Sequence, residues 1–205
     1  MLKLYYSPGS CALASHIALQ EAGAAYTTER IDFKSNRQNS PEYLAVNPKG
    51  RVPAMVTDRG ILTETPAMLA YIAQSFPLAK LAPLDDPFAF AQVQSFNSYL
   101  CSTVHVAHAH GGRGYRWADE ESSLADMKRK VPETVAAGFA LIERGMLKGP
   151  WVMGETYTIC DPYLFTLAQW LDRDGVDLSR LPKVMDHRAR MSERPAVRNA
   201  LAEES

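Results

Sequence analysis

The spacing of hydrophobic positions changes once along the chain and predicts two structural parts. In the first part, apolar residues form short runs of strand length, interrupted by two helical stretches. Asp58-Arg59-Gly60 separates two of these runs and is typical of a hairpin turn. The predicted order is strand, helix, strand, followed by strand, strand, helix, with strands at 2–6, 26–31, 52–57 and 61–63 and helices at 12–22 and from residue 65 onward.

Beyond residue 87 only helical spacing remains. Apolar residues recur three or four positions apart over 89–100, 127–142 and 164–171. The segment FPLAKLAPLDDP, residues 76–87, holds three prolines and no hydrophobic period, which is typical of a linker. We therefore expect an α/β domain over residues 1–78 and an all-helical bundle over residues 87–205.

The charge of the chain is nearly balanced, which disfavours polyanionic partners. The 205 residues include 22 Lys and Arg against 23 Asp and Glu, and 46% of all residues are hydrophobic. No basic footprint for nucleic acid is visible, and no apolar run approaches the ~18 residues of a membrane span. The amino-terminal MLKLYYSPG lacks a signal-peptide pattern. We expect a cytoplasmic protein that binds neither nucleic acid nor membrane.

The three cysteines, Cys11, Cys101 and Cys160, are predicted to be reduced thiols. Their number is odd and no CxxC pair occurs, which argues against a disulfide framework and against a structural zinc site. Cys11 differs from the other two because it follows a Pro8-Gly9 turn and Ser10, the natural N-cap of the next helix. Unpaired N–H groups at a helix start favour an ionised thiol. We therefore expect a lowered pKa for Cys11, which would perform thiol chemistry or lie beside the thiol of a ligand.

Five segments of the sequence resemble the bacterial beta-class glutathione S-transferases. They are YYSPGSCALASHIAL, VNPKGRVPAM, LTETPAMLAYIA, TICDPYLF and MSERPAVRNAL, and in this order they span nearly the whole chain. The resemblance implies a thioredoxin-like first domain, an all-helical second domain that carries the electrophile-side site, and an active site in the cleft between them. It also implies a homodimeric enzyme of detoxification that transfers glutathione, its co-substrate, to a small hydrophobic electrophile without a metal.

The resemblance assigns four residues to glutathione. Val52 precedes Pro53, and a cis peptide bond there would turn the Val52 backbone toward the cysteinyl backbone of glutathione. Glu64 is expected to meet the ammonium of the γ-glutamyl group. Thr65 is expected to cap the helix that follows, so that its hydroxyl and the exposed N–H groups bind the γ-glutamyl carboxylate. Without the resemblance, an ordinary strand-start proline and a cap that only stabilises its own helix are the favoured interpretations.

His105 is the histidine that the resemblance places in the cleft, near the cysteine and the glutathione sulfur. His105, His108 and His110 also suggest a metal site as an alternative. Their spacing puts no two imidazoles at i,i+4 on one helix face, and no cysteine or carboxylate adjoins them. We therefore predict no metal and assign His105 to catalysis.

Tyr6 and Ser10 are further catalytic candidates, because other branches of the superfamily activate the thiol with a tyrosine or a serine near this point. Tyr5 and Tyr6 point to opposite faces of one strand, and Tyr6 is preferred. Whether Cys11 acts covalently, or Ser10 and His105 only stabilise the thiolate of glutathione, stays open. A glutathione-dependent thiol–disulfide oxidoreductase or peroxidase and a non-catalytic ligand-binding protein on the same fold are the alternative functions.

Overall fold

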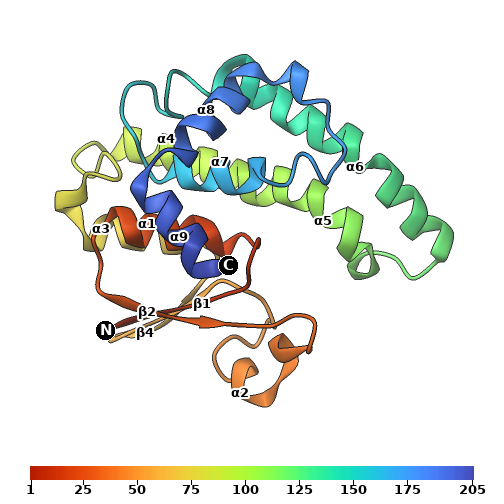
Figure 1. The fold of residues 1–205 in the computed structure, drawn as a ribbon, viewed down its shortest axis with the longest axis horizontal. Coiled ribbons are helices and arrows are strands. Elements are labelled where there is room, and N and C mark those ends of the chain that lie inside the picture. The colour runs from red at the N-terminus through yellow and green to blue at the C-terminus, as the bar shows by residue number, and fades with distance from the viewer.

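A four-stranded mixed sheet forms the base of the first part. The computed structural model describes residues 1–205, and Figure 1 shows the sheet below the layers of helices. The strands are β1 (Leu2–Tyr6), β2 (Tyr26–Arg30), β3 (Ala54–Thr57) and β4 (Gly60–Thr63). Their order is β2-β1-β3-β4, in which β1 runs parallel to β2 and antiparallel to β3, and β4 runs antiparallel to β3.

Two helices cover one face of the sheet and separate it from the second part. α1 (Ala12–Glu21) and α3 (Thr65–Ser75) lie on this face, and the short α2 (Pro41–Leu44) lies beyond the other (Figure 1). α1 also packs against helices of the second part. Because it is covered from several sides, every residue from Ala12 to Leu19 is buried.

Six helices form the second part, and α7 is at its centre. They are α4 (Pro87–Tyr99), α5 (His105–Arg113), α6 (Glu121–Leu141), α7 (Cys160–Ala168), α8 (Pro182–Ser192) and α9 (Pro195–Glu204). Every residue of α7 is buried, because α1, α4 and α8 all pack against it. No helix of the structure combines the length and the apolar character that crossing a membrane requires.

Short helical turns join these elements. Single 3-10 turns occur at Arg37–Asn39, Pro77–Ala79, Gly114–Arg116 and Leu178–Arg180, and π-helical turns at Leu100–Val104 and Ile142–Met146. The π-helical turn Leu100–Val104 connects α4 to α5 and leads directly into His105. Such turns within a helix are frequent at functional sites.

The predicted fold class, a thioredoxin-like α/β domain followed by an all-helical domain, is confirmed. In the first part, the ends of the elements lie within two residues of those predicted, as is usual for such boundaries. In the second part the differences are larger, since α6 already begins at Glu121 and α7 spans Cys160–Ala168, whereas the predicted apolar stripes covered 127–142 and 164–171. The largest shift in the first part is in the third strand, which begins at Ala54 instead of residue 52. Pro53 has no N–H to offer the strand ladder, so pairing starts after it.

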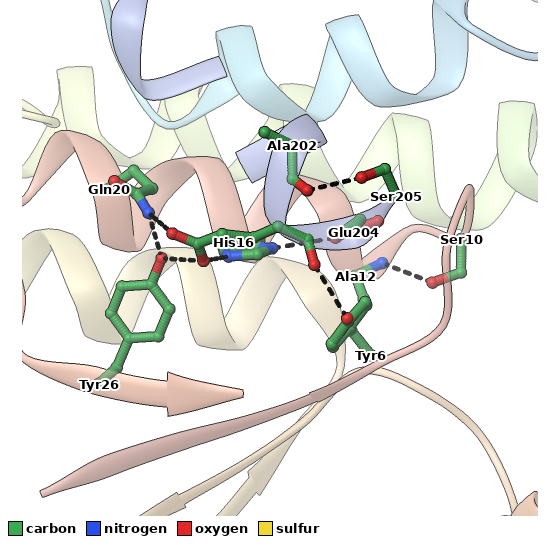
Figure 2. A network of polar contacts seen from close by, with 10 residues as sticks. Tyr6, Ser10, Ala12, His16, Gln20, Tyr26, Ala202, Glu204 and Ser205 are labelled. Carbon is green, nitrogen blue, oxygen red and sulfur yellow. Dashed lines mark hydrogen bonds and ion pairs between the residues drawn. The ribbon is translucent and has the colours of Figure 1, made fainter. Parts of the chain in front are cut away.

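The last helix, α9, returns to the first part and docks on α1 through buried polar contacts (Figure 2). The His16 ring is fully buried, with Nδ1 3.1 Å from the Glu204 carboxylate and Nε2 2.8 Å from the Glu203 carboxylate. Carboxylates only accept, so both ring nitrogens donate and the ring is positively charged. Burial lowers the pKa of His16, but the hydrogen bonds with Glu204 and Glu203 outweigh burial and raise it above its usual value.

Candidate active site

A cavity of about 710 Å³ opens between the two parts, at the amino-terminal ends of α1 and α3. Seven of the eight residues predicted for the site line this cavity: Ser10, Cys11, Val52, Pro53, Glu64, Thr65 and His105. They come from four separate segments of the chain, which the fold brings together. The eighth, Tyr6, is not among the lining residues, because its hydroxyl donates to the Glu203 carbonyl of α9 at 3.2 Å (Figure 2).

The turn before α1 presents Ser10 and Cys11 to the cavity. Gly9 has a left-handed backbone (φ +69°), which a residue with a side chain adopts at a cost. The Ser10 hydroxyl oxygen accepts a hydrogen bond from the Ala12 N–H at 3.3 Å (Figure 2). Ser10 therefore satisfies one of the free N–H groups of the helix start. The prediction that Ser10 is the N-cap is wrong by one residue, because α1 begins at Ala12 and Cys11 occupies the N-cap position.

The structure contradicts the expectation of a lowered pKa for Cys11. The side chain is buried, and burial raises the pKa of the thiol to about 11, although the Thr65 hydroxyl and the charge of Arg113 act in the opposite direction. The sulfur donates to the Val52 carbonyl at 3.6 Å, which requires a protonated thiol. Desolvation thus outweighs the effect of the helix start, and Cys11 is a neutral hydrogen-bond donor at pH 7.

Hydrogen bonds to the Arg51 carbonyl hold the segment before β3. The Tyr43 hydroxyl and the Asn47 amide both donate to this carbonyl, each at 2.6 Å. The Val52-Pro53 peptide bond is cis, as the resemblance implied. The Val52 N–H donates to no group of the protein, so it is free to pair with the backbone of a ligand.

The start of α3 differs from the prediction. Glu64, and not Thr65, occupies the N-cap position, with no side-chain cap and a left-handed backbone (φ +72°). Such a conformation outside glycine costs about 1 to 3 kcal/mol and is found preferentially at functional sites. Thr65 is the first helical residue and is followed by Pro66. Its buried hydroxyl lies next to the Cys11 thiol instead of capping the helix.

Glu64 has a second constraint, because its carboxylate forms an ion pair with the Lys49 ammonium. The Lys49 ammonium also donates to the Thr63 hydroxyl at 2.8 Å. The carboxylate is about half exposed, so a competing cation from a ligand can reach it. The first-turn N–H groups of α3 beside it have no partner within the helix. A carboxylate and free N–H groups are therefore adjacent at this end of α3.

His105 is the first residue of α5 and lines the helical side of the cavity. Its Nε2 atom accepts a hydrogen bond from the Arg113 guanidinium at 3.3 Å. Burial, and then the positive charge of Arg113, lower the pKa of His105 to about 3. The imidazole is therefore neutral at pH 7. It can donate a hydrogen bond from Nδ1, but the positive charge at this place belongs to Arg113.

His108, the second histidine of α5, is held between two charged groups. Its Nδ1 atom lies 2.7 Å from the Asp174 carboxylate, and its Nε2 atom lies 3.0 Å from the Arg173 guanidinium. The carboxylate only accepts and the guanidinium only donates, so Nδ1 carries the proton. The Trp170 ring stacks on His108 at 4.2 Å and donates from Nε1 to the Gly9 carbonyl at 3.0 Å. This bond ties the helical part to the turn before α1.

The three histidines of α5 do not converge on a common point. His110 Nδ1 lies 2.8 Å from the Val106 carbonyl, and its ring stacks on Trp117 at 4.3 Å. No group of three or more His, Cys, Asp or Glu side chains in the structure has an arrangement that could hold a metal ion.

Several lining residues were missed in the sequence. They are Cys101 and Tyr163 between the two parts, and Arg113, Trp170 and Arg173 on the helical side. Only Arg113 had a signal in the sequence, because it lies in the basic and aromatic segment GGRGYRW next to the histidines. The others are separated from His105 by a helical turn or by a long stretch of chain, and only the packing of α7 against α1 and against the π-helical turn before α5 reveals them.

Family models match both parts of this architecture. The model of the glutathione S-transferase N-terminal domain matches residues 1–74, and that of the glutathione S-transferase C-terminal domain matches residues 104–195. Together these ranges cover well over half of the chain. The protein belongs to the glutathione S-transferase family.

Individual relatives agree with this membership. Glutathione S-transferase GstA of Escherichia coli O157:H7 is 33% identical over 206 residues, which cover 99% of this chain and 98% of that protein. The crystal structure of a glutathione transferase homologue from Sulfitobacter with bound glutathione is 47% identical, with a TM-score of 0.96 over 99% of this chain and 98% of that one. A bacterial beta-class glutathione S-transferase from Sphingomonas chungbukensis is 33% identical, with a TM-score of 0.86 over 99% and 98%. The resemblance drawn from the sequence motifs is confirmed.

Proposed function

We propose that the protein is a glutathione transferase that joins glutathione to a small electrophile in the cavity between its two parts. The observation that carries the proposal is the convergence of seven predicted residues from four segments on this one cavity. We name its two sides by their residues: the glutathione wall is Ser10, Cys11, Val52, Glu64 and Thr65, and the helical wall is His105, Arg113, Arg116, Trp170 and Arg173.

Glutathione binds along the glutathione wall through backbone and side-chain contacts. Its cysteinyl backbone pairs with the Val52 N–H, which has no partner in the protein. Its γ-glutamyl carboxylate accepts hydrogen bonds from the Thr65 hydroxyl and the first-turn N–H groups of α3. Its ammonium contacts the Glu64 carboxylate and displaces Lys49, the present partner of that carboxylate.

The sulfur of glutathione then lies at the start of α1. The Ser10 hydroxyl can donate a hydrogen bond to a thiolate there, the Cys11 thiol can do so if it turns away from the Val52 carbonyl, and the Arg113 guanidinium supplies a positive charge from the opposite wall. The thiolate attacks the electrophilic carbon, a carbon–sulfur bond forms, and the leaving group departs with its bonding electron pair. Holding both reactants in one cavity supplies the remaining acceleration.

The environment of Cys11 disfavours the alternative of covalent thiol–disulfide or peroxidase chemistry. A thiol whose pKa is about 11 is almost entirely protonated at pH 7, and the thiolate is the nucleophile in disulfide exchange. A ligand-binding protein without catalysis would use the same cavity but would need no positive charge opposite the sulfur. We therefore favour the transferase over both alternatives.

Further properties follow from family membership and stay proposals. We propose a homodimer, which light scattering coupled to size-exclusion chromatography would test. We also propose that residues 1–78 bind glutathione, that residues 87–205 carry the electrophile side, and that the enzyme acts in detoxification in the cytoplasm.

Calorimetric titration with glutathione, followed by two turnover assays, tests the proposed function. One assay uses a haloaromatic acceptor, and the other uses the mixed disulfide of glutathione and mercaptoethanol. Conjugation of the haloaromatic is the expected result. Turnover of the disulfide alone would replace the transferase by an oxidoreductase, and binding without turnover would support a ligand-binding protein. Absence of glutathione binding would contradict the site itself.

A further inference from the structure

The helical wall carries three arginines that no carboxylate of the protein neutralises. Arg113 ends α5, Arg116 ends the 3-10 turn that follows, and Arg173 follows α7. Asp172 and Asp174, the carboxylates on either side of Arg173, are paired with other side chains. Arg113 and Arg116 therefore line the cavity without a carboxylate partner, and Arg173 is linked to the Asp174 carboxylate only through the His108 ring.

Arg113 has an unused hydrogen-bond donor. Its Nη2 atom donates to His105 Nε2 at 3.3 Å, but its Nε atom is buried and has no hydrogen-bond partner. Burial, and then the positive charge of Arg116, lower the pKa of Arg113, and Arg173 adds to this effect. An anion that binds among these guanidiniums would accept a hydrogen bond from the unpaired donor and would reduce the repulsion between the positive charges.

The positive charge of the cavity exceeds the negative charge that glutathione brings. The cationic lining side chains are Lys49, Arg51, Arg113, Arg116 and Arg173, against Glu64 as the one carboxylate, an excess of four positive charges. The thiolate form of glutathione has two carboxylates, one thiolate and one ammonium, and therefore a net charge of minus two. Two positive charges remain for the second substrate.

Aromatic rings accompany the arginines on the same side of the cavity. Tyr115, Trp117 and Trp170 all line it, and the Tyr115 and Trp117 rings are about half exposed or more. Trp117 is held in place by stacking on His110. Flat rings beside guanidinium groups fit a planar ligand that carries an acidic group at its edge.

We propose that the preferred acceptor is a planar, unsaturated or aromatic electrophile bearing a carboxylate, which Arg116 and Arg173 bind together with the free Nε–H of Arg113. This inference rests on the proposed function, since it names the second substrate of the same site. Guanidinium groups bind carboxylates through paired hydrogen bonds, so they orient the acceptor as well as attract it. The electrophilic carbon is then directed toward the glutathione wall.

A matched pair of acceptors tests the proposal. Para-chloro-meta-nitrobenzoate and the corresponding benzamide have the same ring and leaving group, and only the first is an anion. We expect kcat/KM, divided by the uncatalysed rate with glutathione, to be at least about tenfold higher for the benzoate. The double variant Arg116→Gln, Arg173→Gln should bring this ratio close to one. The control Arg144→Gln changes an exposed arginine outside the cavity and should leave the ratio as in the wild type.

Binding without turnover separates this inference from the proposed function. The enzyme saturated with glutathione is titrated with para-nitrobenzoate and para-nitrobenzamide, followed by tryptophan fluorescence. The benzoate should bind about tenfold more tightly, and added salt should weaken it. Equal affinities for the benzoate and the benzamide would overturn the proposal. A weaker affinity for glutathione in the double variant would also overturn it, because the arginines would then bind glutathione and not the acceptor. Tight benzoate binding without conjugation of either acceptor would keep the anion site and refute the transferase.

Discussion

The two walls of the cavity hold their polar groups in different ways. The glutathione wall offers backbone donors, the Val52 N–H and the first turn of α3, beside short side chains such as the Thr65 hydroxyl, and local hydrogen bonds and helix geometry fix these groups. The helical wall offers long side chains, among them Arg113 and Arg173, which are anchored by His105 and His108. Backbone donors suit one invariant ligand, whereas arginines adapt to several anions. The proposed site thus combines a fixed subsite with an adjustable one.

The largest expected effect is a loss of glutathione affinity, and it comes from the glutathione wall. Thr65→Val removes the hydroxyl and keeps the shape of the side chain, so the γ-glutamyl carboxylate loses a charge-assisted hydrogen bond of ~1.5–3 kcal/mol. The dissociation constant for glutathione, measured by calorimetry, should rise about tenfold to a hundredfold. Because Thr65 does not cap α3, the free energy of unfolding should change little.

Thr65→Ser is the matched control for this variant. It keeps the hydroxyl, and glutathione affinity should stay close to that of the wild type. An unchanged affinity in a folded Thr65→Val variant would show that the carboxylate binds elsewhere and would remove the difference between the two walls.

A smaller effect is expected on the helical wall at His105. Because its pKa is about 3, the ring is neutral and contributes one ordinary hydrogen bond. His105→Ala should lower kcat/KM for conjugation about tenfold, the size of a lost neutral hydrogen bond. In the wild type, the NMR signals of the His105 ring should not titrate between about pH 5 and 8. A midpoint near ~6.5 would show that the ring can carry charge during catalysis.

A still smaller effect is expected for Cys11. Its thiol is neutral and donates a weak hydrogen bond to the Val52 carbonyl, so Cys11→Ala should reduce conjugation by no more than about threefold. Steady-state rates with a haloaromatic acceptor measure this, after circular dichroism has established folding. A loss of a hundredfold or more would make Cys11 the essential thiol-activating group and would restore the expectation drawn from the helix start.

The contact of α9 with α1 links the two parts that carry the walls, and its contribution to the free energy of unfolding should depend on pH. The pKa of His16 is raised in the folded state, so its stabilising contribution is present below the unfolded value of ~6.5 and is lost as pH rises through the folded value. Urea unfolding at several pH values should show this loss in the wild type. His16→Gln should abolish that part of the pH dependence, whereas His110→Gln should retain it. An identical pH dependence in all three proteins would refute the charged state of His16.

The residues of the glutathione wall were easier to predict from the sequence than those of the helical wall. Turn and cap residues such as Pro8, Gly9 and Pro53 mark backbone geometry locally, so the elements of the first part and the residues that line this side of the cavity were predictable from motifs. Arg173 lies far from His105 in the chain, and only the packing of α7 against its neighbours brings the two to one cavity. The pKa of Cys11 was mispredicted because burial is a tertiary effect that a helix-start argument omits. Glu64, and not Thr65, is the N-cap, because Glu64 has a non-helical, left-handed backbone and the helix begins at Thr65.

A crystal structure of the protein with glutathione bound tests the central claim, the division of the cavity into two walls, most directly. We expect the γ-glutamyl carboxylate within hydrogen-bond distance of the Thr65 hydroxyl and the cysteinyl backbone paired with Val52. We also expect Arg116 and Arg173 to be free of either carboxylate. A glutathione molecule whose carboxylates lie on these arginines would show that the cavity is not divided into two walls.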